Sequence, residues 1–201
     1  PQAGMVGTDR DEESTRRARQ VSSRAPFLAT TTDKVARGAG FDLVIALHGT
    51  GGSGEQCKRD YGWSLKAAQA GFLVAYPDGV RSNGPLGIRT WNAGGCCGYA
   101  QESQINDVKF ISALIDHLTA RYRVNPKRIY VTGMSNGAML SYRLACEIPN
   151  RIAAIAPVSG TLITTAPCTP SRPVPVLHIH SALDTLVHPG FRVDAAAEED
   201  S

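Results

Sequence analysis

The residues best suited to chemistry lie in segment 130–138, where a serine stands between two glycines. Gly133, Ser135 and Gly137 form the pattern GxSxG. Between a strand and a helix, this pattern predicts a tight, strained turn that lifts the serine hydroxyl clear of the backbone. Glycine two residues to either side permits the close approach of neighbouring backbone that such a turn requires. We therefore predict that Ser135 is a catalytic nucleophile.

A serine that attacks a carbonyl group creates a negative oxygen, which needs nearby hydrogen-bond donors. The N–H of Asn136, the residue after the nucleophile, is the first predicted donor. The second is the N–H of Thr50, in the His-Gly-Thr-Gly-Gly loop that follows the apolar run 41–47. The side chain of His48 is expected to fix this loop beside the substrate, and a role as catalytic base is the alternative.

An acid and a base must accompany the serine. Asp184 lies just beyond the apolar run 174–179 and is the predicted acid, with a purely turn-forming aspartate as the alternative. His188 is the candidate base, because it is the one histidine beyond Asp184. His178 and His180 alternate along a predicted strand, where packing is a better explanation than metal ligation.

Short apolar runs predict strands, and segments with apolar residues at helical spacing predict helices. The strands are 41–47, 72–76, 128–132, 152–156 and 174–179, and the helices are 62–70, 105–122 and 136–147. Strands that alternate with helices form βαβ units with parallel strands. The sequence therefore predicts an α/β sandwich with a mostly parallel sheet, whose sites lie beyond the carboxyl ends of its strands.

Composition and charge exclude several classes of protein. The chain has 201 residues, 42% of them hydrophobic and 19% charged, which is typical of a soluble globular domain. No apolar run reaches the ~20 residues of a membrane-spanning helix, and a net charge of only +3 argues against a nucleic-acid partner. We predict a loose arm over 1–40, a core over 41–189 and a polar tail over 190–201. The number of subunits is left open.

Cysteine content favours an exported protein. The five cysteines are Cys57, Cys96, Cys97, Cys146 and Cys168, an odd number that prevents complete internal pairing. Their spacing does not suit zinc, so disulfides outside the cell are the better explanation, and neither a metal nor a cofactor is expected. We expect Cys146 to pair with Cys168. The adjacent Cys96 and Cys97 are expected to pair outward rather than with each other.

Several of these motifs together resemble the polyhydroxybutyrate-depolymerase-type esterases, α/β-hydrolases related to feruloyl and acetylxylan esterases. The matching segments are 46–52, 90–98, 107–110, 130–139 and 174–180. The resemblance implies a three-layer sandwich, secretion, and an ester substrate, either a polyhydroxyalkanoate or an ester-decorated plant polysaccharide. It makes Ser135 the nucleophile and Asp184 the acid, with Thr50 and Asn136 as oxyanion donors. It also implies that Trp91 and Asn92 line the substrate pocket.

Both ends of the chain depart from this family's pattern. The family places its catalytic histidine after a further helix and strand, and its fold opens with two hairpin strands. Neither feature is predicted here, and Pro1 is followed by no charged start and apolar run of a signal peptide. We expect a shortened α/β-hydrolase without its last and opening strands. A chain that binds a ligand without turning it over is the alternative function.

Overall fold

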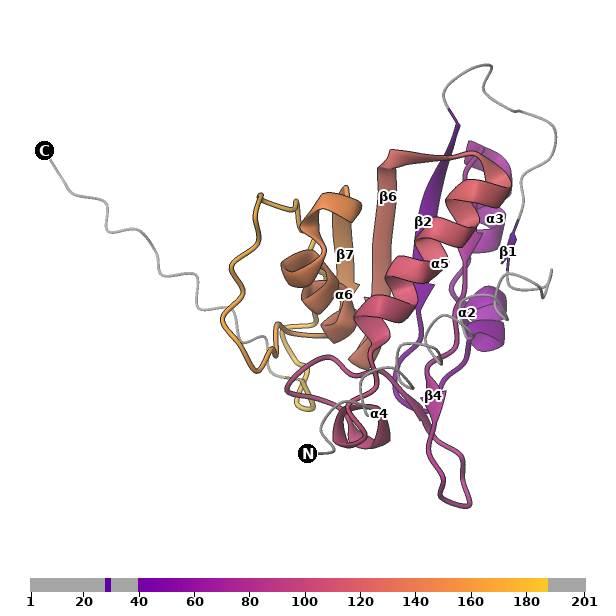
Figure 1. Cartoon of the computed structure of the whole chain (residues 1–201). Coiled ribbons are helices and arrows are strands. Elements are labelled where there is room, and N and C mark those ends of the chain that lie inside the picture. Colours follow the sequence, from indigo (N-terminus) through magenta and orange to yellow (C-terminus); the bar gives the residue numbers. More distant parts are fainter. Residues whose placement is uncertain (1–27, 30–39, 188–201) are drawn as a thin grey trace, which may run out of the picture.

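The computed structural model describes residues 28–29 and 40–187, and shows a sheet with helices on both faces (Figure 1). Five strands lie in the order β1-β3-β2-β6-β7. Their bounds are Leu28–Ala29 for β1, Phe41–Leu47 for β2, Leu73–Ala75 for β3, Val124–Met134 for β6 and Ala154–Val158 for β7. β3, β2, β6 and β7 are parallel, and only β1 is antiparallel to its neighbour. The predicted α/β class with a mostly parallel sheet is confirmed.

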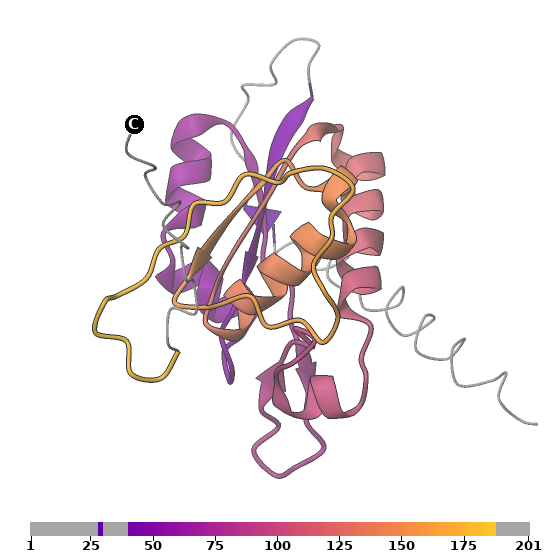
Figure 2. The same cartoon turned by 90° about the vertical axis from the view of Figure 1, so that its left-hand side faces the viewer.

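The helices form two outer layers (Figure 2). α5 and α6 cover one face of the sheet, and α2 and α3 cover the other. The bounds are Gly54–Asp60 for α2, Trp63–Ala70 for α3, Gly98–Glu102 for α4, Asp107–Tyr122 for α5, Asn136–Glu147 for α6 and Pro149–Arg151 for the short 3-10 helix η2. β4, Val80–Arg81, and β5, Arg89–Thr90, form a separate small ribbon. None of the described helices is long and apolar enough to cross a membrane.

The predicted helices are confirmed, with ends set by local capping. The Asn106 side chain accepts a hydrogen bond from the Lys109 N–H at 2.9 Å, so α5 begins at Asp107 rather than at the predicted residue 105. α3 ends at Gly71, whose φ of +85° suits glycine. α2 was not among the predicted helices, because it is short and lies within the glycine-rich region after β2.

Strand β2 shows why the centre of the sheet is apolar throughout. Leu43, Ile45 and Leu47 pack into the cluster beneath α5 and α6, whereas Val44 and Ala46 face α2 and α3. Alternate side chains of a strand point to opposite faces, and here both faces are covered. This burial accounts for the continuous apolar run from which the strand was predicted.

The prediction that segment 174–179 is a strand of the buried sheet needs correction. This segment is neither buried nor a continuous strand. It runs beside β7 and joins it by two parallel bridges, Ile155 with Val176 and Val158 with Ile179. Pro175 has no N–H to donate. Val176 is 46% exposed and Ile179 is 48% exposed, because this segment lies at the edge of the described sheet.

The expectation of a strandless arm over 1–40 is wrong at one place. Leu28 pairs with Ala75 and Ala29 pairs with Val74, which adds an antiparallel strand to the edge of the sheet. The remainder of the predicted arm and the whole predicted tail over 190–201 lie outside the described residues.

One of the two predictions about the cysteines is confirmed and the other is wrong. Cys146 pairs with Cys168, as predicted. Cys96 and Cys97 pair with each other, so their predicted outward pairing is wrong. The fifth cysteine, Cys57, is buried and free, and burial raises its pKa to about 12. Such a thiol is almost entirely protonated near neutral pH and therefore unreactive.

Candidate active site

Ser135 occupies a strained turn between β6 and α6. Its φ of +52° and ψ of −118° lie in a region that non-glycine residues rarely adopt. The Ser135 N–H donates to the Val158 carbonyl at 2.9 Å, which fixes the turn against the end of β7. The residue is only partly buried. This is the backbone conformation that the GxSxG pattern predicts.

The two glycines of the pattern permit this turn by close approach, as predicted. A Cβ atom at Gly133 would lie 2.5 Å from the carbonyl carbon of Gly137. A Cβ at Gly137 would lie 2.6 Å from the carbonyl oxygens of Leu47 and His48. Real Cβ contacts are longer, so any side chain at either position would push α6 away from the sheet.

The loop after β2 lies directly against the serine. A Cβ at Gly49 would be 3.5 Å from the Cβ of Ser135. The Gly51 N–H donates to the Arg89 carbonyl at 2.8 Å and the Gly52 N–H to the Gly49 carbonyl at 3.0 Å. Thr50 is exposed, and its N–H makes no backbone hydrogen bond within the described residues. The roles of Thr50 and Asn136 as oxyanion donors stay predictions.

His48 holds this loop and has no surface for a substrate. Its side chain is fully buried. Nε2 accepts a hydrogen bond from the Gly79 N–H at 2.9 Å, and Nδ1 donates to the Gly49 carbonyl at 2.7 Å. Because both nitrogens are engaged, the imidazole cannot serve as a base in this state. The geometry therefore favours the loop-fixing role of His48 over contact with substrate and over the role of a catalytic base.

Trp91 is likewise a structural residue rather than part of a pocket wall. It is fully buried, and its Nε1–H donates to the His48 carbonyl at 2.9 Å. The Asn136 side chain accepts from the Trp91 N–H at 2.7 Å and donates to the Trp91 carbonyl at 3.0 Å. Asn136 thus ties the residue next to the nucleophile to the tryptophan loop. This burial favours a structural role of the Trp91 side chain over the implied contact with substrate.

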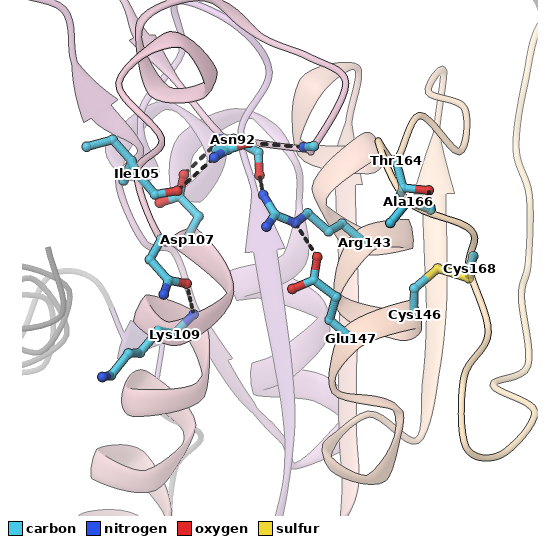
Figure 3. A network of polar contacts seen from close by, with 12 residues as sticks. Asn92, Ile105, Asp107, Lys109, Arg143, Cys146, Glu147, Thr164, Ala166 and Cys168 are labelled. Atoms are coloured by element: carbon cyan, nitrogen blue, oxygen red, sulfur yellow. Dashed lines mark hydrogen bonds and ion pairs between the residues drawn. A yellow bond between two sulfur atoms is a disulfide. The ribbon is translucent and has the colours of Figure 1, made fainter. Parts of the chain in front are cut away.

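Asn92 belongs to a polar network on the same loop (Figure 3). The Asn92 N–H donates to the buried Asp107 carboxylate at 2.8 Å, and its side-chain amide donates to the Ile105 carbonyl at 2.9 Å. The Asn92 carbonyl accepts from Arg143 at 2.8 Å. Asn92 therefore holds the loop to the start of α5 through its backbone N–H and to Ile105 through its side chain, and at 5% exposure it leaves almost no surface for a substrate.

Asp184 lies in a turn that binds its carboxylate. Oδ1 accepts hydrogen bonds from the N–H groups of Val187 at 2.9 Å and Leu186 at 3.0 Å, and these bonds hold the pKa of Asp184 below its ordinary value. His180 Nε2 donates to the Val187 carbonyl at 2.7 Å and lies 3.2 Å from Asp184 Oδ2. Because the pKa of Asp184 is lowered, its contribution to stability is present above pH 3.8 and is lost as the pH falls further.

Ser135 and the Asp184 turn both lie where chain segments of the sheet end. The Ser135 N–H binds the last residue of β7, Val158, and the Ser159 N–H binds the Ile179 carbonyl at 2.9 Å. Ser135 follows β6 and His180 follows segment 174–179, with β7 between them, so both residues lie at the carboxyl edge of the sheet. No hydrogen bond joins Ser135 to Asp184 within the described part of the chain, and His188, the candidate base, lies outside it.

The His180 contacts predict a local effect of substitution. The side-chain amide of glutamine at position 180 would reach about as far as the Nε2 atom of His180 and could still donate a hydrogen bond to the Val187 carbonyl. The amide of asparagine is one methylene group shorter and would not reach that carbonyl. We expect His180→Asn to speed amide hydrogen exchange of Leu186 and Val187 about tenfold relative to His180→Gln. Equal exchange in the two variants would show that His180 does not hold the turn.

Sequence reasoning missed two positioning side chains. Asn136 was assigned a role only through its N–H, because the chain gives no local signal of a partner 45 residues away. His180 was assigned to packing, and its ring does stack on His178 with 5.1 Å between centroids. Its spacing of four residues from Asp184 is the signal that could have revealed their contact.

A parallel sheet between helices, with a serine on a strained turn where a central strand meets a helix, defines the class of α/β-hydrolases. The chain belongs to the esterase PHB depolymerase family, which matches residues 35–199. The family resemblance stated from the sequence is confirmed.

Similar proteins carry related descriptions. The chain is 35% identical over 179 residues to NocK of Nocardia uniformis subsp. tsuyamanensis, a protein to which esterase activity is ascribed, covering 87% of this chain and 50% of that one. It is 33% identical to feruloyl esterase B of Piromyces equi, covering 78% of this chain and 28% of that one. The chain thus spans half or less of these relatives' length.

A solved structure supports the fold alone. The acetyl xylan esterase from Aspergillus awamori superposes with a TM-score of 0.55 at 22% identity, over 68% of this chain and 46% of that one.

Proposed function

We propose that this chain is a serine carboxylic-ester hydrolase that acts on feruloyl, acetyl or hydroxyalkanoate esters. The observation that carries the proposal is the backbone of Ser135, strained at a φ of +52° and packed against Gly49 at the carboxyl edge of the sheet. A strained conformation persists only where its surroundings enforce it, and it is concentrated at functional sites. The name of one relative, feruloyl esterase B, supports the ester class.

The proposed reaction proceeds in two halves. The Ser135 oxygen attacks the ester carbonyl carbon while its proton passes to a histidine base, for which His188 is the candidate. The N–H groups of Thr50 and Asn136 stabilise the tetrahedral oxyanion until the alcohol leaves with that proton. Water then attacks the acyl-serine and gives a proton to the same base, and the base returns that proton to the Ser135 oxygen as the carboxylic acid is released. Asp184 orients the base.

We also propose that the protein works outside the cytoplasm. The Cys146–Cys168 disulfide supports this location, because structural disulfides persist in oxidising compartments.

Hydrolysis of three esters tests the proposed function. We expect saturable turnover of p-nitrophenyl acetate, methyl ferulate or a 3-hydroxybutyrate dimer, and the fastest of the three identifies the acyl group. Inhibition by a serine-directed phosphonate is the expected companion result. Failure of all three esters to turn over above the buffer rate would contradict the proposal.

A further inference from the structure

A pocket of about 220 Å³ lies away from Ser135, between the second half of α6 and segment 164–169. Arg143 and Glu147 line it from the helix, and Gly94 lines it from the loop after β5. Figure 3 shows Arg143 between Asn92 and Glu147, with Thr164 and the Cys146–Cys168 disulfide beyond it. The catalytic steps proposed above use none of the residues that line this pocket.

The walls of the pocket are held in place without a ligand. The disulfide between Cys146 and Cys168 joins α6 covalently to the opposite wall. The Gly95 N–H donates to the Ile163 carbonyl at 2.7 Å, and a Cβ at Gly94 would lie 3.2 Å from the Cα of Thr164. A ligand that enters a preformed site loses less free energy to the ordering of the protein.

The polar groups of the pocket favour an uncharged ligand. Arg143 and Glu147 are the only charged residues among those that line it, and Arg143 Nε donates to Glu147 Oε1 at 2.6 Å. The opposite charges cancel, so a charged ligand gains no net attraction. The pair nevertheless presents guanidinium donors beside a carboxylate acceptor, and the hydroxyls of Thr165 and Thr169 can donate or accept.

The volume of the pocket suits a ligand of about one ring. Binding pockets for drug-sized molecules usually measure roughly 300–1,000 Å³, so 220 Å³ suits a smaller molecule. It equals the liquid volume of about seven waters. A small, uncharged ring with several hydroxyl groups, each able to donate and accept, matches both the volume and the mixture of donors and acceptors.

We propose that the pocket bordered by Arg143, Glu147 and segment 164–169 binds an uncharged pyranose or furanose sugar ring. Arg143 lies eight residues beyond Ser135 on α6, roughly 12 Å along the helix axis. The pocket is therefore a separate site, and sugar binding there does not require ester hydrolysis.

Nuclear magnetic resonance titration of the full chain tests the proposal, with xylose as the uncharged probe and glucuronate as the charged one. We expect xylose to shift the amide signals of Gly94 and segment 164–169 saturably, with a Kd of about 1 mM. Ala166→Trp, at an exposed lining position, should weaken binding at least about tenfold. Leu65→Trp, at an exposed position on α3, should leave binding unchanged.

Two further variants complete the test. Glu147→Gln removes the balancing anion and should favour glucuronate over xylose at least about threefold relative to the unsubstituted chain. Ser135→Ala should bind xylose normally, which separates this proposal from that of ester hydrolysis. Absence of saturable shifts, shifts elsewhere on the chain, or unchanged xylose binding in Ala166→Trp would overturn the proposal.

Discussion

Ser135→Ala is expected to lower the rate of ester hydrolysis at least about 10³-fold, because no other described hydroxyl occupies the elbow. The methyl group of alanine fits the same strained backbone, so the fold should persist. The measurement is kcat/KM for p-nitrophenyl acetate, with circular dichroism to confirm that the variant is folded.

Ser159→Ala is the matched control. Ser159 also has a positive φ, of +47°, and also follows a strand of the same sheet, one strand further on. No helix follows Ser159 among the described elements, so the hydrolysis rate of Ser159→Ala should stay within about twofold of that of the unsubstituted chain. Equal losses in the two variants would show that the strained sheet edge, and not the Ser135 hydroxyl, is what activity requires.

Gly137→Ala is expected to destabilise the protein by about 3 kcal/mol, near the upper limit for inserting one methyl group into a packed interior. The added Cβ would lie 2.6 Å from the carbonyl oxygens of Leu47 and His48, and backbone atoms cannot swing aside as side chains do. α6 and the Ser135 turn must shift instead. Urea unfolding measures the loss of stability, and ester hydrolysis should fall with it.

Gly84→Ala provides the comparison for that substitution. Gly84 is exposed, and the nearest atom to an added Cβ would be the Ser82 hydroxyl at 3.9 Å. We expect the free energy of unfolding to change by less than about 0.5 kcal/mol. Similar losses in Gly84→Ala and Gly137→Ala would contradict the tight packing of the elbow.

The central elements could be predicted because their signals are local. β2 is buried on both faces and is apolar throughout, and α6 begins directly after the Ser135 turn and shows apolar residues at helical spacing. The segment 174–179 has a similar apolar composition, but at the edge of the described sheet its side chains remain exposed. Composition alone does not distinguish a central strand from an edge.

Residues of the candidate site were found where the motif is contiguous in sequence. The turn at Ser135 and the close approach of its glycines follow from five consecutive residues. The clamp from Asn136 to Trp91 and the bond from Gly79 to His48 join residues 45 and 31 positions apart. Such contacts depend on how the chain folds back, and no local pattern encodes them.

The roles of His48 and Trp91 could not be predicted from residue type alone. A histidine and a tryptophan near a glycine-rich loop suggested substrate contacts, yet both side chains are fully buried and donate hydrogen bonds to the loop backbone. Polar atoms buried in a protein need such partners, and a loop of small residues supplies few of its own. These two side chains fix the backbone of the loop from its buried side.

Covalent labelling of the intact chain tests the central claim most directly. After treatment with a serine-directed fluorophosphonate, mass spectrometry of the peptides should place one phosphonyl group on Ser135, and Ser135→Ala should remain unlabelled. An unlabelled chain, or a label on another residue that persists in Ser135→Ala, would contradict the assignment of Ser135 as the nucleophile.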